Sequence, residues 1–151
     1  MNRRRVSLAV VLMAATLGIA ACDEKLADLA GPTPNLTPTF SSIQRDIFNT
    51  SDSSGRLACI NCHTDQGRTP AGGLLLLEGR SYPQLVNIAS RFKAGATLVI
   101  PGDADNSYLI HKLEGRSDMT GSRMPRGTGP FLTQGQMEII RRWITLGAKN
   151  D

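Results

Sequence analysis

A CxxCH segment at residues 59–63, with the sequence CINCH, restricts what this chain can fold into more than any other feature. It lies in the stretch SDSSGRLACINCHTDQGRTPAGG, which is polar, rich in glycine and almost without an apolar pattern. Two cysteines at this spacing, followed by a histidine, fit four kinds of site: a pair of thioether anchors for a c-type haem, half of a zinc site, a dithiol redox centre, or a plain disulfide. The choice among them depends on the rest of the chain.

The N-terminus has the pattern of a secretory signal. Three arginines at positions 3–5 precede an apolar run from Val6 to Ala21, which only Ser7 and Thr16 interrupt. The run has 16 residues, whereas a helix that crosses a bilayer needs about 20. We therefore expect residues 1–21 to be a signal peptide that takes no part in the fold.

The end of this segment, GIAAC at residues 18–22, resembles the lipobox of bacterial lipoproteins. In that motif an aliphatic residue and two small residues precede the cysteine that is acylated and becomes the new N-terminus. The resemblance implies lipid attachment at Cys22; ordinary cleavage that leaves a free Cys22 thiol is the alternative. Because two or more acyl chains anchor a protein stably, we expect a lipoprotein on a membrane surface of the bacterial cell envelope, facing the periplasm or the exterior.

Removal of the signal changes the charge balance. The full chain has 17 lysines and arginines against 13 acidic residues, and residues 1–21 contain three arginines and no acid, which leaves 14 against 13, a formal net charge of +1. A nucleic-acid partner needs basic side chains clustered on one face, and the sequence shows no such cluster. No nucleic acid is therefore expected as a partner.

Composition divides the exported part into two regions. Residues 22–40 contain three prolines and three threonines and little periodic apolar character, which is typical of a flexible tether. Residues 41–151 have the size of one small domain.

Within that domain, four segments carry the apolar spacing or the end signals of short helices. They are residues 42–49 with Ser41 or Ser42 as N-cap, residues 81–92 with Pro83 in the first turn, a helix after Asp105 or Asn106 that ends at Gly115, and a last helix after Thr133 that ends at Gly147. GGLLLLEG, residues 72–79, fits either a buried extended segment or a single turn. Helices joined by long glycine-rich loops predict a small all-α domain.

Haem fits the CxxCH segment best. Short helices bury little apolar surface, and a domain with so many long loops usually wraps them around something else. Covalent haem c would supply that core: the thiols of Cys59 and Cys62 would add to its vinyl groups, and His63 would be the proximal iron ligand.

The other three kinds of site are less well supported. Zinc needs at least three protein ligands; His111 could join Cys59, Cys62 and His63, but the adjacent Cys62 and His63 suit one tetrahedral ion poorly, and there is no second cysteine pair. A thioredoxin-like dithiol needs a strand before the first cysteine, which the sequence does not predict. A bare disulfide stays open as an alternative.

Further segments resemble a known family. PAGGLLLL, VIPGDADNSYLIHKL, RMP and LTQGQMEIIRRWITLGA look like single-haem c-type cytochrome domains, in which CxxCH is followed by a GGL segment, a PGDPxxSxL helix, an MP loop and a final W-I-x-x-GA helix. The resemblance covers about residues 41–148 and implies the all-α cytochrome c fold around one haem. It also implies that the first and last helices cross, with Ile47, Phe48, Trp143 and Ile144 as candidates for the contact. One departure is the segment SDSSGRLA before CINCH, where relatives often place the motif directly after the first helix.

The same resemblance implies Met124 of the MP loop as the sixth ligand of the iron. Pro125 would stiffen its approach from the face opposite His63. Met119, in the same loop, is the direct rival, and His111 would give a bis-histidine haem of lower potential. Met137 lies on the apolar stripe of the last helix, so packing explains it.

Four arginines flank these segments and are candidate partners of the haem propionates: Arg56, Arg68, Arg123 and Arg126. With both axial positions filled, the iron would have no open position for a substrate. We therefore expect an electron-transfer protein, not an enzyme, which exchanges single electrons with redox partner proteins at the membrane, alone or as the cytochrome subunit of a larger complex. A sensor or enzyme with an open distal site, and a surface lipoprotein without redox function, are the alternatives.

Overall fold

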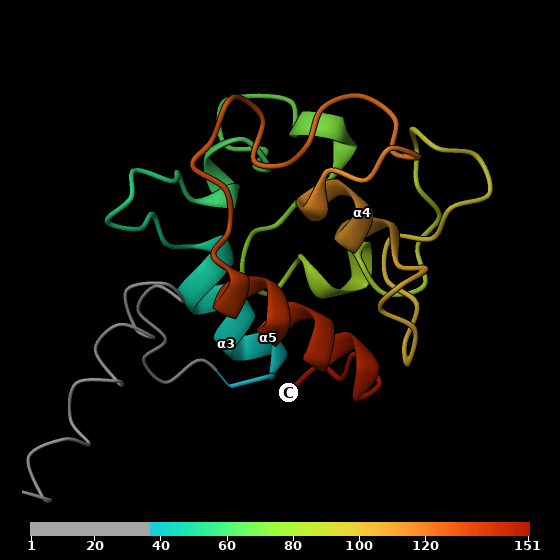
Figure 1. Ribbon diagram of the computed structural model, residues 1–151. Helices are drawn as coiled ribbons and strands as arrows, with labels where there is room; N and C mark the ends of the chain where they lie inside the picture. The colour runs from blue at the N-terminus through green and yellow to red at the C-terminus, as the bar shows by residue number, and fades with distance from the viewer. Residues whose placement is uncertain (1–36) are drawn as a thin grey trace, which may run out of the picture. The chain divides into compact units, whose positions relative to one another are not determined.

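The computed structural model describes residues 37–151 (Figure 1). The predicted signal peptide, the predicted lipid attachment at Cys22 and most of the predicted tether lie outside the described residues. Within 37–151, no helix is both long enough and apolar enough to cross a membrane.

Helices and single turns alternate with long loops. Helix α3 (Phe40–Ile43) continues directly into a π-helical turn, η1 (Gln44–Phe48), and the other long elements are α4 (Tyr108–Glu114) and α5 (Gln134–Thr145). Three single 3-10 turns lie between them: η2 (Cys59–Asn61), η3 (Ala71–Gly73) and η4 (Tyr82–Gln84). In the described part, β-pairing is limited to three isolated bridges: Val86 with Val99, Ala89 with Thr97, and Ile100 with Asp103.

Helix α3 begins two residues before the predicted start. Its N-cap is Thr39, whose hydroxyl accepts a hydrogen bond from the Ser42 amide at 3.3 Å. Two more amides of the first turn bond to a distant residue: Phe40 donates to Asp151 Oδ1 at 2.9 Å and Ser41 donates to Asp151 O at 2.8 Å. The prediction of Ser41 or Ser42 as the cap was wrong, because Thr39 and Asp151 together satisfy these free amides.

Helix α5 follows its local sequence signals. Thr133 is the N-cap, as predicted, and forms a capping box in which its hydroxyl accepts from the Gln136 amide while the Gln136 side chain accepts from the Thr133 amide. The helix ends at Thr145, and Gly147 takes a positive φ of 101° just beyond it. Ile140, Trp143 and Ile144 are buried.

α3 and α5 lie side by side and form the centre of the core (Figure 1). The rings of Phe40 and Trp143 are 5.2 Å apart between centroids, and the Tyr82 ring lies 5.2 Å from Phe40. The residues expected at this contact are all buried in the same core, namely Ile47, Phe48, Trp143 and Ile144. Helix α3 thus packs on α5 through Phe40 and Trp143, as predicted for the first and last helices, while a crossing of the two beside a haem stays a prediction.

Residues 81–92 do not form the predicted helix. After the turn η4, Asn87 takes a positive φ of 58°, and the chain pairs with residues 97–99: Asn87 donates to Val99 O at 2.9 Å and Leu98 donates to Ile88 O at 2.7 Å. β-Branched Val86 and Ile88 favour extended backbone. Residues 86–89 therefore pair with a segment about ten residues further along instead of forming the helix that their apolar spacing predicts.

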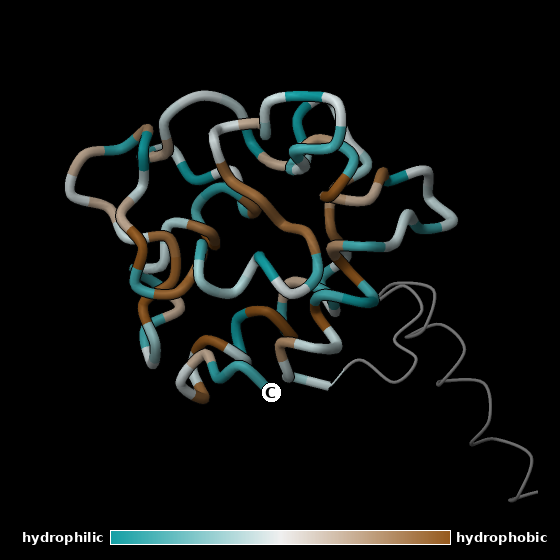
Figure 2. The backbone as a smooth tube through the Cα atoms, turned by 180° about the vertical axis from the view of Figure 1, so that it is seen from behind, coloured by the Kyte–Doolittle hydropathy of each residue, from teal (hydrophilic) through white to brown (hydrophobic). Residues whose placement is uncertain are grey.

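Helix α4 begins after Ser107 instead of after Asp105 or Asn106. The Ser107 hydroxyl accepts from the Ile100 amide at 2.9 Å and donates to Asp103 O at 2.7 Å, which fixes the loop before the helix. Gly115, with φ 77°, ends the helix as predicted. The apolar segment 74–77 leaves η3 in extended form with Leu75 and Leu76 buried, and it crosses the rear view as one hydrophobic stretch (Figure 2).

Candidate functional site

A buried arginine organises the loop that precedes CINCH. The Arg56 side chain is fully buried; its Nε donates to Asp52 Oδ2 at 2.8 Å, and its Nη atoms donate to the carbonyls of Ile47 at 3.3 Å, Leu57 at 3.2 Å and Thr50 at 3.0 Å. These bonds tie the inserted loop to the end of η1. Since these bonds engage all three of its nitrogens, Arg56 is a structural residue of the loop, and the interpretation as a propionate partner does not suit it.

The CINCH segment forms a tight turn on this support. The amides of Cys62 and His63 both donate to Cys59 O, at 3.2 and 2.9 Å. Cys59 is half-buried against the core and Cys62 is exposed, and both carry free thiols. Burial raises the pKa of the Cys59 thiol, although the charge of Arg56 opposes this. A dithiol redox centre needs a lowered thiol pKa, so the dithiol interpretation gains no support.

His63 is half-buried, and one of its ring nitrogens is engaged by the backbone. Its Nδ1 lies 3.1 Å from Leu74 O, a bond that orients the ring and leaves Nε2 as the nitrogen available to a metal. Burial lowers the pKa of His63, and its hydrogen bonds to the backbone of Leu74 and Ala71 oppose that effect only in part. The imidazole is therefore neutral at neutral pH, which is the form that binds metals.

The GGL segment places the Leu74 carbonyl. Gly72 and Gly73 both take positive φ, and a Cβ on Gly73 would lie 2.6 Å from Arg91 Nη1, while one on Gly72 would lie 3.3 Å from the Phe92 ring. The Arg91 and Phe92 side chains are exposed and can move aside, so the positive φ is what favours glycine at both positions. The two glycines therefore permit the turn after which the Leu74 carbonyl meets His63.

Met124 borders the same core. It is half-buried and packs against the apolar cluster, as Cys59 and Leu74 also do. Its amide donates to Lys112 O, in the last turn of α4, at 2.8 Å. Met119 is half-buried too, but it is not among the side chains packed against that cluster, and its amide donates to Arg116 O at 3.1 Å within its own loop. Of the two methionines, Met124 is the one fixed to the core.

His111 is engaged at both ring nitrogens. Nδ1 lies 2.9 Å from Asp118 Oδ2 and Nε2 lies 2.8 Å from Asp105 O. Asp118 also pairs with Lys93 at 2.6 Å, so the imidazole belongs to a surface ion-pair network. Ligation of iron by His111 would require one of these two hydrogen bonds to break and the ring to leave this network, which favours Met124 over His111.

The donor set is poor for zinc and sufficient for haem. Among residues 37–151, no three side chains of His, Cys, Asp or Glu are grouped closely enough to hold a metal ion, whereas zinc takes at least three such ligands. Haem iron obtains four ligands from the porphyrin and asks the protein for only one or two. His63 and Met124 are of the right kind for those two positions.

Comparisons with protein-family models, curated proteins and solved structures gave no match. The interpretation of the site therefore depends on the residues of this chain alone. Two surface hollows of about 220 and 320 Å³ lie elsewhere, beside Phe40 and Tyr82 and beside Lys93 and Tyr108. Neither is lined by the CINCH segment or by Met124. The candidate site is therefore identified by its ligand side chains and not by a surface hollow.

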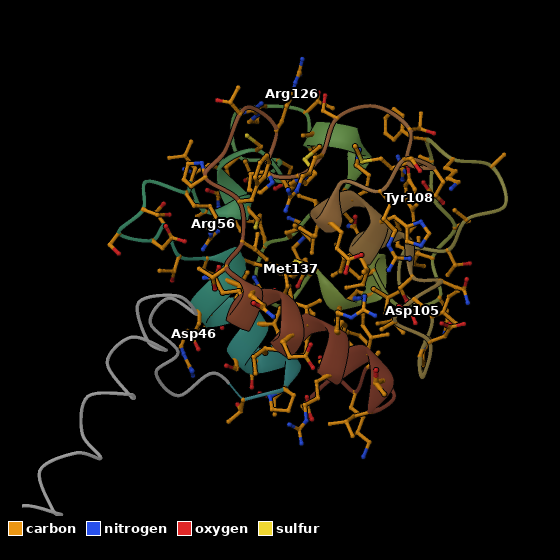
Figure 3. The ribbon with its side chains drawn as sticks, in the orientation of Figure 1. Asp46, Arg56, Asp105, Tyr108, Arg126 and Met137 are labelled. Carbon is orange, nitrogen blue, oxygen red and sulfur yellow. The ribbon has the colours of Figure 1, made fainter. Side chains whose placement is uncertain are left out.

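The remaining flanking arginines differ in their surroundings. Arg68 is exposed and donates to Asn61 O at 3.1 Å. Arg126 is exposed and extends outward from its loop (Figure 3). Arg123 donates through Nε to Leu113 O at 2.8 Å and lies over the Phe131 ring, 3.8 Å from its centroid.

Sequence reasoning missed three contributors to the site. These are the Leu74 carbonyl, the Lys112 carbonyl and the Phe131 ring. A carbonyl is present on every residue and carries no sequence signal, and Phe131 lies among the glycines and prolines of a loop. Only the folded chain shows what they contact.

Proposed function

We propose that this chain is a lipid-anchored monohaem c-type cytochrome that carries single electrons between redox partner proteins at the membrane, alone or as the cytochrome subunit of a larger complex. The observation that carries the proposal is His63, which directly follows the two free thiols and has its Nδ1 held by Leu74 O. That bond is the usual support of a histidine that ligates metal through its other nitrogen.

The residues present fit a covalent haem. Cys59 and Cys62 are the two thiols, His63 is a neutral imidazole and Met124 is a half-buried thioether on the core. Several half-buried apolar side chains flank that core and could contact the porphyrin: Ile60, Leu74, Leu109, Met124 and Met137. Haem, when bound, supplies an iron that alternates between two oxidation states; the protein holds it, shields it from water and sets its potential.

The ligand pair supports electron transfer over catalysis. In a haem-loaded protein His63 and Met124 would hold the iron and leave no open position for a substrate, and a methionine ligand would favour the reduced iron and raise the potential. A lipid on Cys22 would keep the domain near its partners and raise their effective concentration.

The test is to express the protein with a c-type maturation system and to record oxidised and reduced spectra of wild type, Met124→Ala and the matched control Met119→Ala. We expect covalent low-spin haem in wild type, with the weak near-infrared band of iron–methionine ligation. The band should vanish in Met124→Ala and persist in Met119→Ala.

Other outcomes would contradict specific parts of the proposal. A wild-type protein without covalent haem would overturn it entirely. Covalent haem without the methionine band would exclude Met124 as the ligand and would favour an open distal site, which binding of carbon monoxide to the reduced protein would reveal.

A further inference from the structure

The loop that carries Met124 is fastened to the last turn of α4. The Met124 amide donates to Lys112 O at 2.8 Å, and Arg123 Nε donates to Leu113 O at 2.8 Å. In return, Lys112 Nζ donates to Thr120 O at 2.9 Å and also to Ser122 O. Helix and loop are thus joined in both directions, immediately before the Met–Pro pair.

The end of α4 is shaped to receive Arg123. A Cβ on Gly115 would lie 2.7 Å from Arg123 Cδ and 3.2 Å from Arg123 Cγ. The guanidinium covers the Phe131 ring at 3.8 Å, within the range of a cation–π contact. Arg123 therefore passes across the glycine that ends the helix and reaches residue 131 on the far side of the loop.

We propose that Arg123 and Lys112 are positioning residues that hold Met124 where it can bind haem iron. This inference rests on the proposed function. The position of Arg123 in the sequence suggested that it pairs with a haem propionate. The proposal gives it a different role, because its Nε and the face of its guanidinium already form contacts within the protein.

The physical reason is the weakness of the ligand. A thioether is neutral and binds iron(III) loosely, so an external ligand can displace it if the loop moves away easily. The apparent affinity of an external ligand depends on the fraction of molecules in which its site is accessible. If α4 holds the Met124 loop in place, only a small fraction of molecules has the iron site open to an external ligand.

Arg126 provides a matched control for Arg123. It lies in the same loop on the other side of the Met–Pro pair, is exposed, and points away from the fold (Figure 3). The Arg126 side chain forms no hydrogen bond or ion pair with any residue of 37–151.

The experiment is a titration of the oxidised haem protein with imidazole, which displaces a methionine ligand and removes its near-infrared band. For Arg123→Gln and for Lys112→Met we expect imidazole to bind about tenfold more tightly than to wild type, as a tenfold larger open fraction requires. Arg126→Gln should stay within about twofold of wild type on the same reasoning.

Arg123→Lys separates positioning from charge. Lysine keeps the cation but has neither the Nε donor nor the planar face that covers Phe131. The positioning proposal predicts that Arg123→Lys behaves like Arg123→Gln. Wild-type imidazole affinity in Arg123→Lys would instead indicate a charge partner such as a propionate, and would overturn it.

Hydrogen exchange gives a second readout that does not depend on the spectrum. The Met124 amide should exchange faster in Arg123→Gln than in Arg126→Gln, while amides of α5 stay unchanged. If wild type has the methionine band but both arginine variants match it in imidazole affinity and exchange, the positioning proposal is wrong and the cytochrome proposal stands. If wild type binds no haem, both fail.

Discussion

At the scale of a single residue, Arg56 shows how one buried cation can position the turn that carries the CINCH segment. Its guanidinium pairs with Asp52 and with three carbonyls of the loop and of η1. A buried charge is tolerated only when it is paired and hydrogen-bonded. The segment SDSSGRLA, residues 51–58, therefore supplies its own support for the turn that carries Cys59.

The first prediction concerns this pair. Asp52→Asn should lower the free energy of unfolding by about 1–3 kcal/mol at neutral pH, because Arg56 stays buried without its counter-ion. Urea unfolding of wild type and variant measures this. Asp65→Asn is the control, because Asp65 pairs with Arg80 on the surface and should cost less than about 1 kcal/mol.

The same pair gives a pH dependence with a definite sign. Burial alone would raise the pKa of Asp52, but hydrogen bonds from Ser54 and Arg56 outweigh it and bring that pKa below its ordinary value. A group whose pKa is lower in the folded state stabilises the fold above its ordinary pKa and loses that effect as the pH falls. The stability gap between wild type and Asp52→Asn should therefore shrink below about pH 4; a gap that is constant down to about pH 2 would contradict the pairing.

At the scale of elements, a helix could be predicted from the sequence only where the signals that determine it lie within the helix or next to it. α5 could be predicted because Thr133, its apolar stripe and Gly147 all lie within the helix or next to it. The helix expected over 81–92 does not form because its backbone pairs with residues 97–99. The sequence of 81–92 alone carries no information about that pairing. The cap of α3 was misassigned although Thr39 lies close to the predicted caps, and the further bonds of its first turn to Asp151, more than a hundred residues away, have no local signal.

The site divides in the same way. Cys59, Cys62 and His63 could be named from their spacing, since the chemistry of each lies in its own side chain. The hydrogen bond that Leu74 O accepts from His63 Nδ1 could not, because it depends on the turn that the positive φ of Gly72 and Gly73 produces. The structural role of Arg56, which the sequence suggested as a propionate partner, could not be predicted either, because arginine is mostly exposed in folded proteins.

The second prediction tests the capping box of α5. Thr133→Ala should lower the free energy of unfolding by about 1 kcal/mol, because the Gln136 amide loses its acceptor at the start of the helix. Thr145→Ala, at the exposed end of the same helix, removes only a bond to Arg141 O and should change stability by less than about 0.5 kcal/mol. Equal effects of the two changes in denaturant unfolding would show that the cap does not stabilise α5.

At the scale of the whole molecule, the fold depends on one core that also borders the candidate site. Phe40, Trp143 and Ile144 form its buried centre, while half-buried Cys59, Leu74 and Met124 lie at its margin. A cofactor bound at that margin would cover apolar surface that is now only partly covered. Cofactor binding and folding should therefore be coupled.

The third prediction follows from this coupling. The double variant Cys59→Ala with Cys62→Ala should be less stable than the haem-loaded wild type by several kcal/mol, since it loses the burial of apolar surface under haem, which stabilises by about 25 cal/mol per Å². Cys62→Ser should be intermediate, because the half-buried Cys59 anchor remains. Thermal unfolding of the three proteins measures this; equal midpoints for all three would mean that the margin of the core needs no cofactor.

The amides of Phe40 and Ser41 both donate to Asp151, so residue 151 stands beside the first turn of α3. Residue 37, whose amide donates to Ser42 Oγ at 3.3 Å, lies at the same place. Arg126 is at the opposite side of the described domain (Figure 3). Coupling to a solid support through a short linker at either position would thus leave the loop of Met124 and Arg126 on the side away from the support.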